Sequence, residues 1–286
     1  MNIQTWFDKP TSTLTHCIFD ETSKDAILID PVWDYDQASG SLKEVSIALV
    51  RDFIRSHNLK LHLILETHAH ADHITGAQRL KQYFPTAKIA IGARITDVQT
   101  AFKSIFNLGE SFATDGRQFD LLLKDGSQTQ AGTLSIKTMY TPGHTPACVS
   151  YLIGDTVFTG DALFMPDSGT GRCDFPAGSA EDLYDSIKKL YALPDNTRVF
   201  VGHDYQAGGR DVRWESTISE QKRTNIQLKD STTRQEYVAM RKTRDKTLSA
   251  PKLLFPSIQV NADGGHLPEA ESNGHRYLKM PIAIKE

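Results

Sequence analysis

Features typical of secreted, membrane-embedded or disulfide-stabilised proteins are scarce in this sequence of 286 residues. The three cysteines, Cys17, Cys148 and Cys173, are widely spaced and form no CxxC pair, so they fit a reducing compartment better than a disulfide framework. No apolar run approaches the roughly 20 residues of a membrane-spanning helix, and the N-terminal residues lack the basic and apolar regions of a signal peptide. We therefore expect a cytoplasmic protein that has no membrane partner.

The sequence also lacks an excess of positive charge. Its 32 Lys and Arg against 35 Asp and Glu give a formal net charge of −3. Because a nucleic-acid-binding surface is usually basic, we expect no nucleic-acid partner. The length is sufficient for one large domain with an appendage, and a hydrophobic content of 39% is ordinary for a globular protein.

Short apolar runs alternate with helical patterns along most of the chain. We expect strands over residues 14–20, 25–31, 61–67, 87–93, 119–126, 132–142, 147–154, 155–161 and 197–203. Helical spacing covers residues 41–57, 71–84, 95–106 and 179–194, the last opening at the capping residue Ser179. Two basic helical patterns follow residue 208, and the last 30 or so residues are punctuated by Pro and Gly. Strands that cluster in each half, with helices around them, predict two sheets packed face to face with helices outside.

A dense group of potential metal ligands follows the expected strand at residues 61–67. His68, His70, Asp72 and His73 form an HxHxDH pattern within six positions. On a loop between a strand and a helix, such a pattern can direct imidazoles and a carboxylate to one point. The alternative is a polar surface loop whose histidines are hydrogen-bonded to protein or water. A lone His would favour that alternative, whereas three His and an Asp at this spacing argue against it.

Three later segments repeat the order of an apolar strand followed by a ligand-type residue. His144 lies on a Gly-Pro turn, Asp161 follows a strand and a Gly, and His203 does the same. Each is weak alone, but together with HxHxDH in this order they are specific for a metal site. The remaining histidines have no such context, so no role is assigned to His16, His57, His62, His266 and His275.

These motifs, read as THAHADH, GHTPACVSY, TGDALF and VGHDY, resemble the metallo-β-lactamase superfamily over roughly residues 12–206. Within it, residues 160–187, with the run GRCDFPAGS, resemble the persulfide dioxygenase branch, as do residues 30–36 and 252–265. The competing branch is glyoxalase II, a dinuclear thiolester hydrolase with a different helical C-terminal domain.

The resemblance implies an α/β (α+β) fold, a four-layered αββα sandwich with a C-terminal helical and irregular extension. We expect the catalytic domain at residues 1–207 and the extension, packing on the same domain, at residues 208–286.

For the metal, the resemblance implies one Fe(II) per chain held by His68, His144 and Asp161. Two imidazoles and one carboxylate leave coordination positions open, as non-haem iron oxygenases require. The residues placed in an outer shell or a second metal site are His70, Asp72, His73 and His203. All ligand types of the dinuclear relatives are nonetheless present, so two zinc ions bridged by Asp161 stay open on ligand identity alone.

The implied reaction converts glutathione persulfide, O₂ and water into sulfite and glutathione, and a homodimer is common in this branch. The first alternative is a glyoxalase II-like hydrolase of glutathione thiolesters with a dinuclear site. A second, of another class, is a non-catalytic scaffold that has kept the fold, which need hold no metal.

The resemblance also assigns residues to catalysis and to the glutathione part of the substrate. The catalytic candidates are Asp72, His73 and Tyr205. Arg172 and Tyr205 align with glutathione-binding positions of glyoxalase II, and an Arg can hold a carboxylate through two hydrogen bonds. A second tyrosine of that family corresponds here to Asp174, and the structural alternative is an Arg172 paired with Asp174 or Asp204.

Four further residues receive structural interpretations. Lys222 and Arg223 could add positive potential near the pocket, but a solvated helix face is the simpler reading. Cys173 is treated as a small hydrophobic residue because the reaction needs no protein thiol. Asp30, at the end of a strand, is expected to orient the ligand loop by hydrogen bonds.

Overall fold

The computed structural model describes residues 1–282 and 284, and its centre is a pair of six-stranded sheets. The first contains β1 (Asn2–Asp8), β2 (Thr13–Phe19), β3 (Asp25–Ile29), β6 (Lys60–Leu65), β8 (Lys88–Gly92) and β9 (Leu121–Leu123) in that order. The second contains β10 (Gln128–Ala131), β11 (Leu134–Tyr140), β12 (Val149–Ile153), β13 (Thr156–Phe158), β14 (Arg198–Phe200) and β15 (Glu215–Thr217). A small third sheet joins β5 (Ser41–Lys43), β4 (Val32–Asp36) and β7 (Ile74–Thr75).

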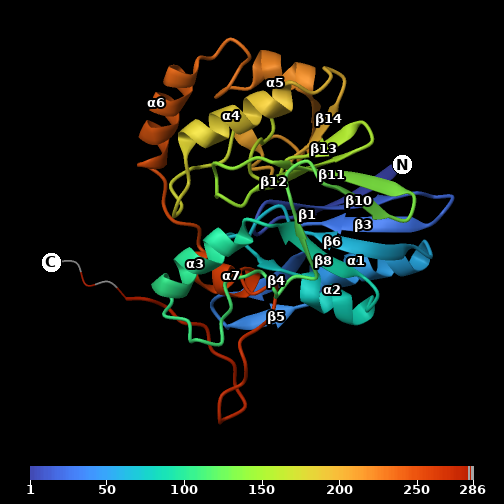
Figure 1. Ribbon diagram of the computed structural model, residues 1–286, viewed down its shortest axis with the longest axis vertical. Coiled ribbons are helices and arrows are strands. Elements are labelled where there is room, and N and C mark those ends of the chain that lie inside the picture. Colours follow the sequence, from blue (N-terminus) through green and yellow to red (C-terminus); the bar gives the residue numbers. More distant parts are fainter. Residues whose placement is uncertain (283, 285–286) are drawn as a thin grey trace.

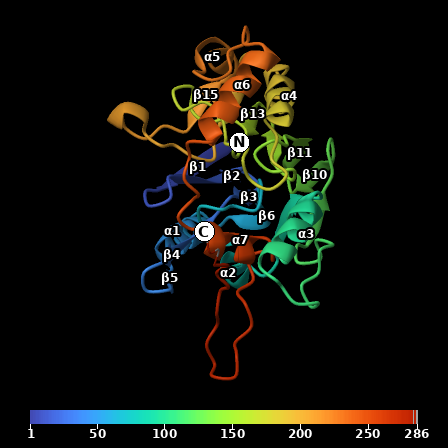
Figure 2. The same ribbon diagram turned by 90° about the vertical axis from the view of Figure 1, so that its left-hand side faces the viewer.

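Helices lie on both outer sides of the paired sheets (Figures 1 and 2). One side holds α1 (Val45–Ser56), α2 (Ala77–Tyr83), α3 (Ile95–Ile105) and α7 (Leu254–Asn261). The other side holds α4 (Ala180–Tyr191), α5 (Ile218–Thr224) and α6 (Arg234–Asp245). This arrangement confirms the αββα sandwich expected from the sequence.

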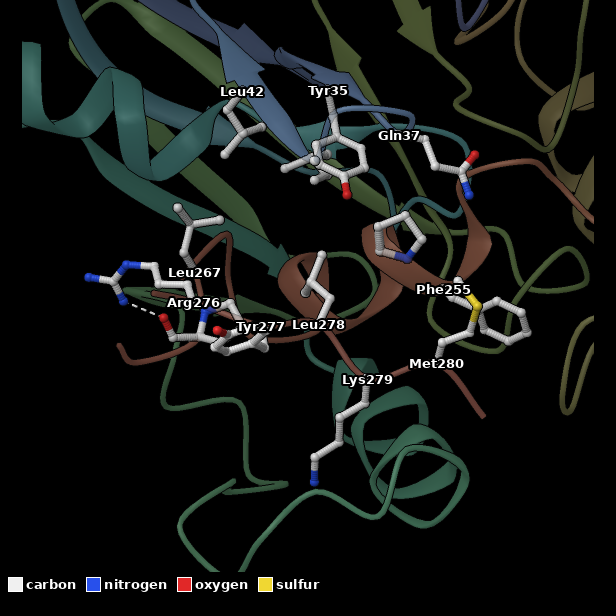
Figure 3. A pocket seen from close by; sticks show the side chains of 14 residues that line it. Tyr35, Gln37, Leu42, Phe255, Leu267, Arg276, Tyr277, Leu278, Lys279 and Met280 are labelled. Carbon is white, nitrogen blue, oxygen red and sulfur yellow. Dashed lines mark hydrogen bonds between the residues drawn. The ribbon is translucent and has the colours of Figure 1, made fainter. Parts of the chain in front are cut away.

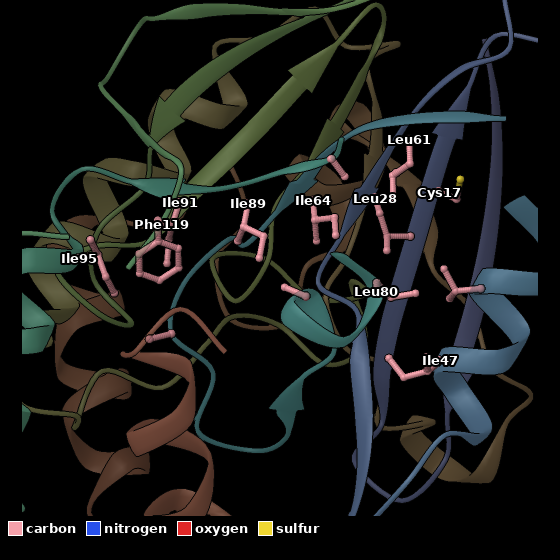
Figure 4. Packing of buried hydrophobic residues seen from close by; sticks show 14 of the residues in the cluster. Cys17, Leu28, Ile47, Leu61, Ile64, Leu80, Ile89, Ile91, Ile95 and Phe119 are labelled. Carbon is pink, nitrogen blue, oxygen red and sulfur yellow. The ribbon is translucent and has the colours of Figure 1, made fainter. Parts of the chain in front are cut away.

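The alternation of side chains along the strands builds the layers. Ile18 and Ile27 face the second sheet, in a cluster that includes Tyr151 and Phe158. Cys17 and Leu28, their sequence neighbours, face the opposite way into a cluster with α1 and α2, seen in Figure 4. Because successive strand residues point to opposite faces, one strand can supply both layers. Each fully buried aliphatic side chain contributes about 1.5–3 kcal/mol to this packing.

The capping signal at Ser179 is confirmed. Its hydroxyl accepts a hydrogen bond from the backbone N–H of Asp182, and Glu181 and Asp182 occupy the first turn of α4. A side-chain cap of this kind satisfies one of the free N–H groups at a helix start, and negative charges there interact favourably with the helix dipole.

Several segments differ from the sequence expectation; Ser41–Lys43, expected at the start of a helix, form strand β5, and α1 begins only at Val45. The helix expected over residues 71–84 begins only at Ala77, because Ile74 and Thr75 pair with β4 as strand β7. Residues 2–8, to which no element was assigned, form the edge strand β1 against β2. Residues 254–261, expected to be irregular, form α7, in which Pro256 lies in the first turn, where a helix needs no N–H donor.

Parallel pairing brings the functional loops to one edge. β3 and β6 run parallel, as do β6 and β8, and β13 and β14 in the second sheet. The carboxyl ends of parallel strands meet at the same edge, which is a rigid base for site residues. Of the helices in residues 1–282 and 284, none has the length and apolar character needed to cross a membrane. The division of the chain at residue 207 stays a prediction.

Candidate metal centre

All seven ligand candidates lie on loops that follow strands. His68, His70, Asp72 and His73 lie between β6 and β7, His144 between β11 and β12, Asp161 after β13, and His203 after β14. Every one of the histidines is buried, and Asp161 has 7% of its surface exposed. The structure therefore brings together residues that are separated by up to 135 positions, 203 − 68, in the chain.

The first group consists of His68, His144 and Asp161. One possible ligand atom from each residue lies within 4.8 Å of those from the other two. His144 Nδ1 donates a hydrogen bond to the carbonyl oxygen of Arg172 at 2.7 Å, so its Nε2 is free to face the group, 3.5 Å from Asp161 Oδ2. A histidine ligand held through its other nitrogen in this way has a defined tautomer and ring orientation.

The orientation of His68 is set by a relay through Thr67 and Asp30. The Thr67 hydroxyl donates to Asp30 Oδ2 at 2.8 Å and so accepts from His68 Nδ1 at 3.0 Å. Asp30 Oδ1 also accepts the backbone N–H of Thr67 at 2.8 Å. Asp30 thus makes the hydrogen bonds to the ligand loop that the sequence suggested. Gly160, with a φ of 47°, is required beside this relay, because a Cβ there would lie 2.5 Å from Thr67 Oγ1.

A chain of short contacts leads from the carboxylate of Asp161 to His203, then to Asp72 and His73. His203 Nε2 lies 3.2 Å from Asp161 Oδ1 and 3.7 Å from Asp72 Oδ2. His203 Nδ1 donates to the carbonyl of Ser12 at 3.3 Å, and His73 Nδ1 lies 3.0 Å from Asp72 Oδ2. These residues, with Asp161 between the two groups, retain the composition of a second metal position.

His70 lies beside His68, but its Nε2 has partners outside the first group. Its Nε2 lies 3.0 Å from Asp30 Oδ1 and 3.4 Å from Glu66 Oε2. His70 also has a possible ligand atom within 4.8 Å of Asp72 and His73, whereas it is absent from the group of His68, His144 and Asp161. The rings of His68 and His70 lie side by side, with 4.0 Å between centroids, but Nε2 of His70 faces Asp30 and Glu66.

Burial and neighbouring charges shift the pKa values at this centre. Burial lowers the pKa of the His68 imidazole well below its usual value, and the nearby His70 and His144 add to this effect. Burial alone would raise the pKa of Asp72, but His203 and His73 outweigh it and hold that pKa well below its ordinary range. A neutral imidazole and an ionised carboxylate are the forms that bind metal ions.

Several buried polar atoms at this centre have no protein partner. Within residues 1–282 and 284, His68 Nε2, His73 Nε2 and Asp161 Oδ1 make no hydrogen bond. A buried polar atom left unpaired costs about 1–3 kcal/mol, so three such atoms among the ligand candidates require an explanation. A bound metal ion supplies it, and the residues present fit such an ion: two imidazoles and a carboxylate in one group, with further imidazoles and a carboxylate beside it.

A cavity of about 540 Å³ opens onto the first group. Its lining includes His144, Asp161, Arg172, Phe175 and Tyr205. The ring of Tyr205 stacks on that of His203 at 5.8 Å between centroids, and 55% of its surface is exposed. Arg172 and Tyr205 therefore lie where a substrate next to the first group would reach them, and their role in binding stays a prediction.

Arg172 already has protein partners. Its Nε and Nη2 each donate to the carboxylate of Asp174 at 2.6 Å, and Nη1 donates to the carbonyl of Ser249 at 2.7 Å. Of the two structural pairings considered for Arg172, the structure contains the one with Asp174. Asp204 is instead bound by Arg210, at 2.7 and 2.8 Å.

The structure agrees with the structural interpretations of Lys222, Arg223 and Cys173. Lys222 pairs with Asp195 at 2.7 Å, and neither Lys222 nor Arg223 lines the cavity next to the first group. Cys173 is buried, and burial raises the pKa of its thiol, which makes it a poor nucleophile.

Two residues that contact the ligand loop were not identified from the sequence. Asn261, at the end of α7, donates to the carbonyl oxygens of His70 and His73. Glu66, directly before the HxHxDH motif, has its Oε1 bonded to the Thr75 hydroxyl and its Oε2 next to His70. The position of Glu66 beside the motif was an available signal, whereas nothing local marked Asn261.

A second pocket, of about 420 Å³, lies beside the cavity, and the two share Tyr35 and Gln37 in their linings. Figure 3 shows Tyr35 and Leu42 of the β4–β5 hairpin facing Leu278 and Phe255 across it. This pocket contains none of the seven ligand candidates.

Comparison with known proteins agrees with this geometry. The family described as "Metallo-beta-lactamase superfamily" matches residues 11–203. The chain is 44% identical to a probable metallo-hydrolase of Burkholderia pseudomallei over 99% of both chains. It is 48% identical to glyoxylase B2 of Dictyostelium discoideum, over 93% of this chain and 91% of that protein. In two beta-lactamase hydrolase-like proteins, from Agrobacterium fabrum and Xylella fastidiosa, it spans only 65% and 64% of their length.

Two further similarities concern persulfide dioxygenases. The chain is 34% identical to the mitochondrial persulfide dioxygenase ETHE1 of Bos taurus, over 86% of this chain and 81% of that protein. The crystal structure of ETHE1 from Myxococcus xanthus superposes with a TM-score of 0.73 at 33% identity, covering 93% of this chain and all of that one.

Proposed function

The chain belongs to the metallo-beta-lactamase superfamily, and we propose that it is a persulfide dioxygenase with one iron per chain. The proposed reaction is glutathione persulfide, O₂ and water giving glutathione, sulfite and two protons. The terminal sulfur is oxidised, both atoms of O₂ are transferred to it and O₂ is reduced, and water provides the third sulfite oxygen. The chain has relatives with enzyme names, among them persulfide dioxygenase ETHE1.

The observation that carries the proposal is the composition of the first group. His68, His144 and Asp161 converge as two imidazoles and one carboxylate, and His70 is absent from them. This set matches the iron-binding triad of non-haem oxygenases, which leaves about half of the metal's positions open. When bound, iron(II) would supply the open positions at which a persulfide sulfur and O₂ can meet.

The protein's own residues hold and shield this centre. The Thr67–Asp30 relay and the Arg172 carbonyl fix the two imidazoles, which reduces the reorganisation needed during reaction. Asp72 and His73 are proposed to accept and donate protons as water adds to the oxidised sulfur. Arg172 and Tyr205, on the cavity wall, are proposed to bind the glutathione part.

A glyoxalase II-like thiolester hydrolase is the second candidate. It is favoured by the similarity to glyoxylase B2 and by the second set of residues, His70, Asp72 and His73, whose ligand atoms lie within 4.8 Å of one another. Two metals bridged by Asp161 could activate water for attack on a thiolester. The two candidates differ in metal content and in their need for O₂. A non-catalytic scaffold need hold no metal.

We also propose that the chain forms a homodimer. Large apolar side chains at the C-terminal end, Tyr277, Met280, Ile282 and Ile284, are 50–92% exposed. An exposed apolar segment of this kind is typical of an interaction surface. A single species with twice the mass of the chain in light scattering would support the dimer, and a monomer at micromolar concentration would contradict it. A cytoplasmic location stays a prediction.

The test is O₂ consumption by anaerobically purified, metal-analysed protein supplied with glutathione persulfide, with hydrolysis of S-lactoylglutathione measured in parallel. We expect O₂ uptake with sulfite formation and about one iron per chain. Thiolester hydrolysis with two metals per chain and no uptake would assign the protein to the hydrolases instead. Inactivity in both assays by metal-loaded protein would favour the scaffold.

A further inference from the structure

The C-terminal helix α7 contributes one side chain to the loop that carries the ligand candidates. Asn261, the last residue of α7, is 3% exposed. Its Nδ2 donates to the carbonyl oxygens of His70 at 2.8 Å and His73 at 2.7 Å, and its Oδ1 accepts the N–H of Thr75 at 2.9 Å. We propose that Asn261 is a positioning residue that holds the loop over residues 68–75 in the conformation that binds metal.

The amide of Asn261 is fully used by this loop. An asparagine offers two N–H donors and one carbonyl acceptor, and here each of them has a backbone partner in the loop. An aspartate at the same position could accept from Thr75 but could not donate to either carbonyl. Loss of the Asn261 amide would leave three backbone groups of the loop, the carbonyls of His70 and His73 and the N–H of Thr75, without this partner.

The loop also has side-chain contacts, in which Thr13 Oγ1 donates to Asp72 Oδ2 at 3.1 Å and the Thr75 hydroxyl donates to Glu66 Oε1, but little regular secondary structure. Residues 66–73 form neither helix nor strand, and only Ile74 and Thr75 join a sheet, through a two-residue pairing with β4. Both histidine carbonyls bound by Asn261 belong to ligand candidates, and Asp72 lies between them. Asn261 therefore holds the backbone from which the side chains of His70, Asp72 and His73 project.

Helix α7 is itself firmly attached, so it can act as a fixed support. Gln99 of α3 donates to the carbonyl of Ala262 at 2.9 Å, and Gln78 of α2 donates to that of Gly264 at 3.1 Å. Gly264 has a φ of 67° and approaches Gln118 so closely that a Cβ would lie 2.6 Å from its carbonyl oxygen. The C-terminal extension thus links the helical layer to the metal centre.

The inference rests on the metal site of the proposed function but not on the substrate, so it is tested by metal affinity. Cobalt(II) is titrated into the chelator-treated full chain, and the dissociation constant and visible absorption of the cobalt complex are measured for Asn261→Ala and the native protein. The matched control is Gln99→Ala, which removes another fully buried amide that holds the same C-terminal segment without touching the ligand loop.

We expect both variants to lose stability, and Asn261→Ala alone to bind cobalt about 10–100-fold more weakly, the range typical of lost outer-shell support. Its cobalt spectrum should differ from that of the native protein, and kcat should fall while KM changes little. If Asn261→Ala does not fold, Asn261→Ser, which keeps one hydroxyl group, is measured in the same way. Native affinity and spectrum in the folded variant, or an equal loss in Gln99→Ala, would overturn the proposal. Failure of the native protein itself to bind metal would instead overturn the proposed function.

Discussion

Strands β3 and β6 carry a histidine–aspartate pair at each of their two ends, and the two pairs differ in their surroundings. At the beginning of the strands, Asp25 Oδ1 and His62 Nε2 are 2.6 Å apart, with side chains 11% and 36% exposed. At the other end, Asp30 Oδ1 and His70 Nε2 are 3.0 Å apart, and both side chains are 2% exposed.

The partners of the two pairs explain why only one end is a candidate site. Asp25 also accepts the N–H of Thr133 at 2.9 Å, so its oxygens are satisfied by the protein and by solvent. At the other end, His68 Nε2, His73 Nε2 and Asp161 Oδ1 make no hydrogen bond within the described residues 1–282 and 284. A partly exposed pair contributes little to stability, whereas unpaired atoms in a buried position are retained only where a ligand can satisfy them. A histidine and an aspartate therefore form a partly exposed ion pair at one end and lie beside a candidate metal site at the other.

The largest loss of metal and activity is expected when a residue of the first group of ligand candidates is replaced. Replacing His68, His144 or Asp161 with Ala should remove iron and abolish O₂ uptake, a greater loss than the roughly 10–100-fold typical of outer-shell variants. His62→Gln, at the other end of the same strands, should keep both. Metal analysis and persulfide oxidation rates check this, and full activity in any of the three Ala variants would contradict the assignment.

A smaller effect is expected from the cavity wall. Arg172→Ala should raise KM for glutathione persulfide about 10–100-fold, the value of a charge-assisted contact of about 1.5–3 kcal/mol, with iron retained. The control is Arg210→Ala, which removes an Arg likewise bound to aspartates but outside the cavity lining. Loss of metal in Arg172→Ala, with its carbonyl contact to His144 disturbed, would show that the residue is structural.

A third histidine, His16, is buried like His70 but has no ion pair with a carboxylate in the part of the chain that the structure describes. Burial lowers its pKa from 6.5 to about 4, although Val201 accepts a hydrogen bond from its Nε2 at 3.0 Å. The unfolded chain therefore binds a proton between pH 6.5 and 4 that the folded chain does not, so stability falls as the pH is lowered through this window. Between pH 7 and pH 5 this one group removes about 2 kcal/mol.

Denaturant unfolding of metal-free protein at the two pH values measures this effect, with His16→Gln as the comparison. The variant should be less stable at pH 7, but its loss on going to pH 5 should be smaller by about 2 kcal/mol. An equal loss in both proteins would show that His16 is not responsible.

The smallest effect on stability is expected at the partly exposed pair of Asp25 and His62. His62→Gln should change the free energy of unfolding by no more than about 1 kcal/mol, as for other exposed ion pairs. Its metal content and activity should equal those of the native protein. A reduction in metal content would mean that the two ends of β3 and β6 are coupled, and would remove the basis of the comparison.

Local sequence was sufficient for much of this protein. Short apolar runs that cluster in each half predicted the two sheets, Ser179 marked the start of α4, and the order of HxHxDH, His144, Asp161 and His203 indicated the metal centre. These signals are local because strand periodicity, helix caps and ligand motifs depend on residues a few positions apart.

Tertiary structure was needed for contacts between distant segments. Residues 254–261 carry no strong helical pattern, and the pairing of Asn261 with His70 and His73 spans 191 and 188 positions. The rings of His68 and His70 are 4.0 Å apart, and only packing decides that Nε2 of His70 meets Asp30 and Glu66 while His68 joins His144 and Asp161. Sequence alone determined which residues could bind a metal, and only the packing of strands and helices decided which of them converge, because that depends on contacts no local pattern encodes.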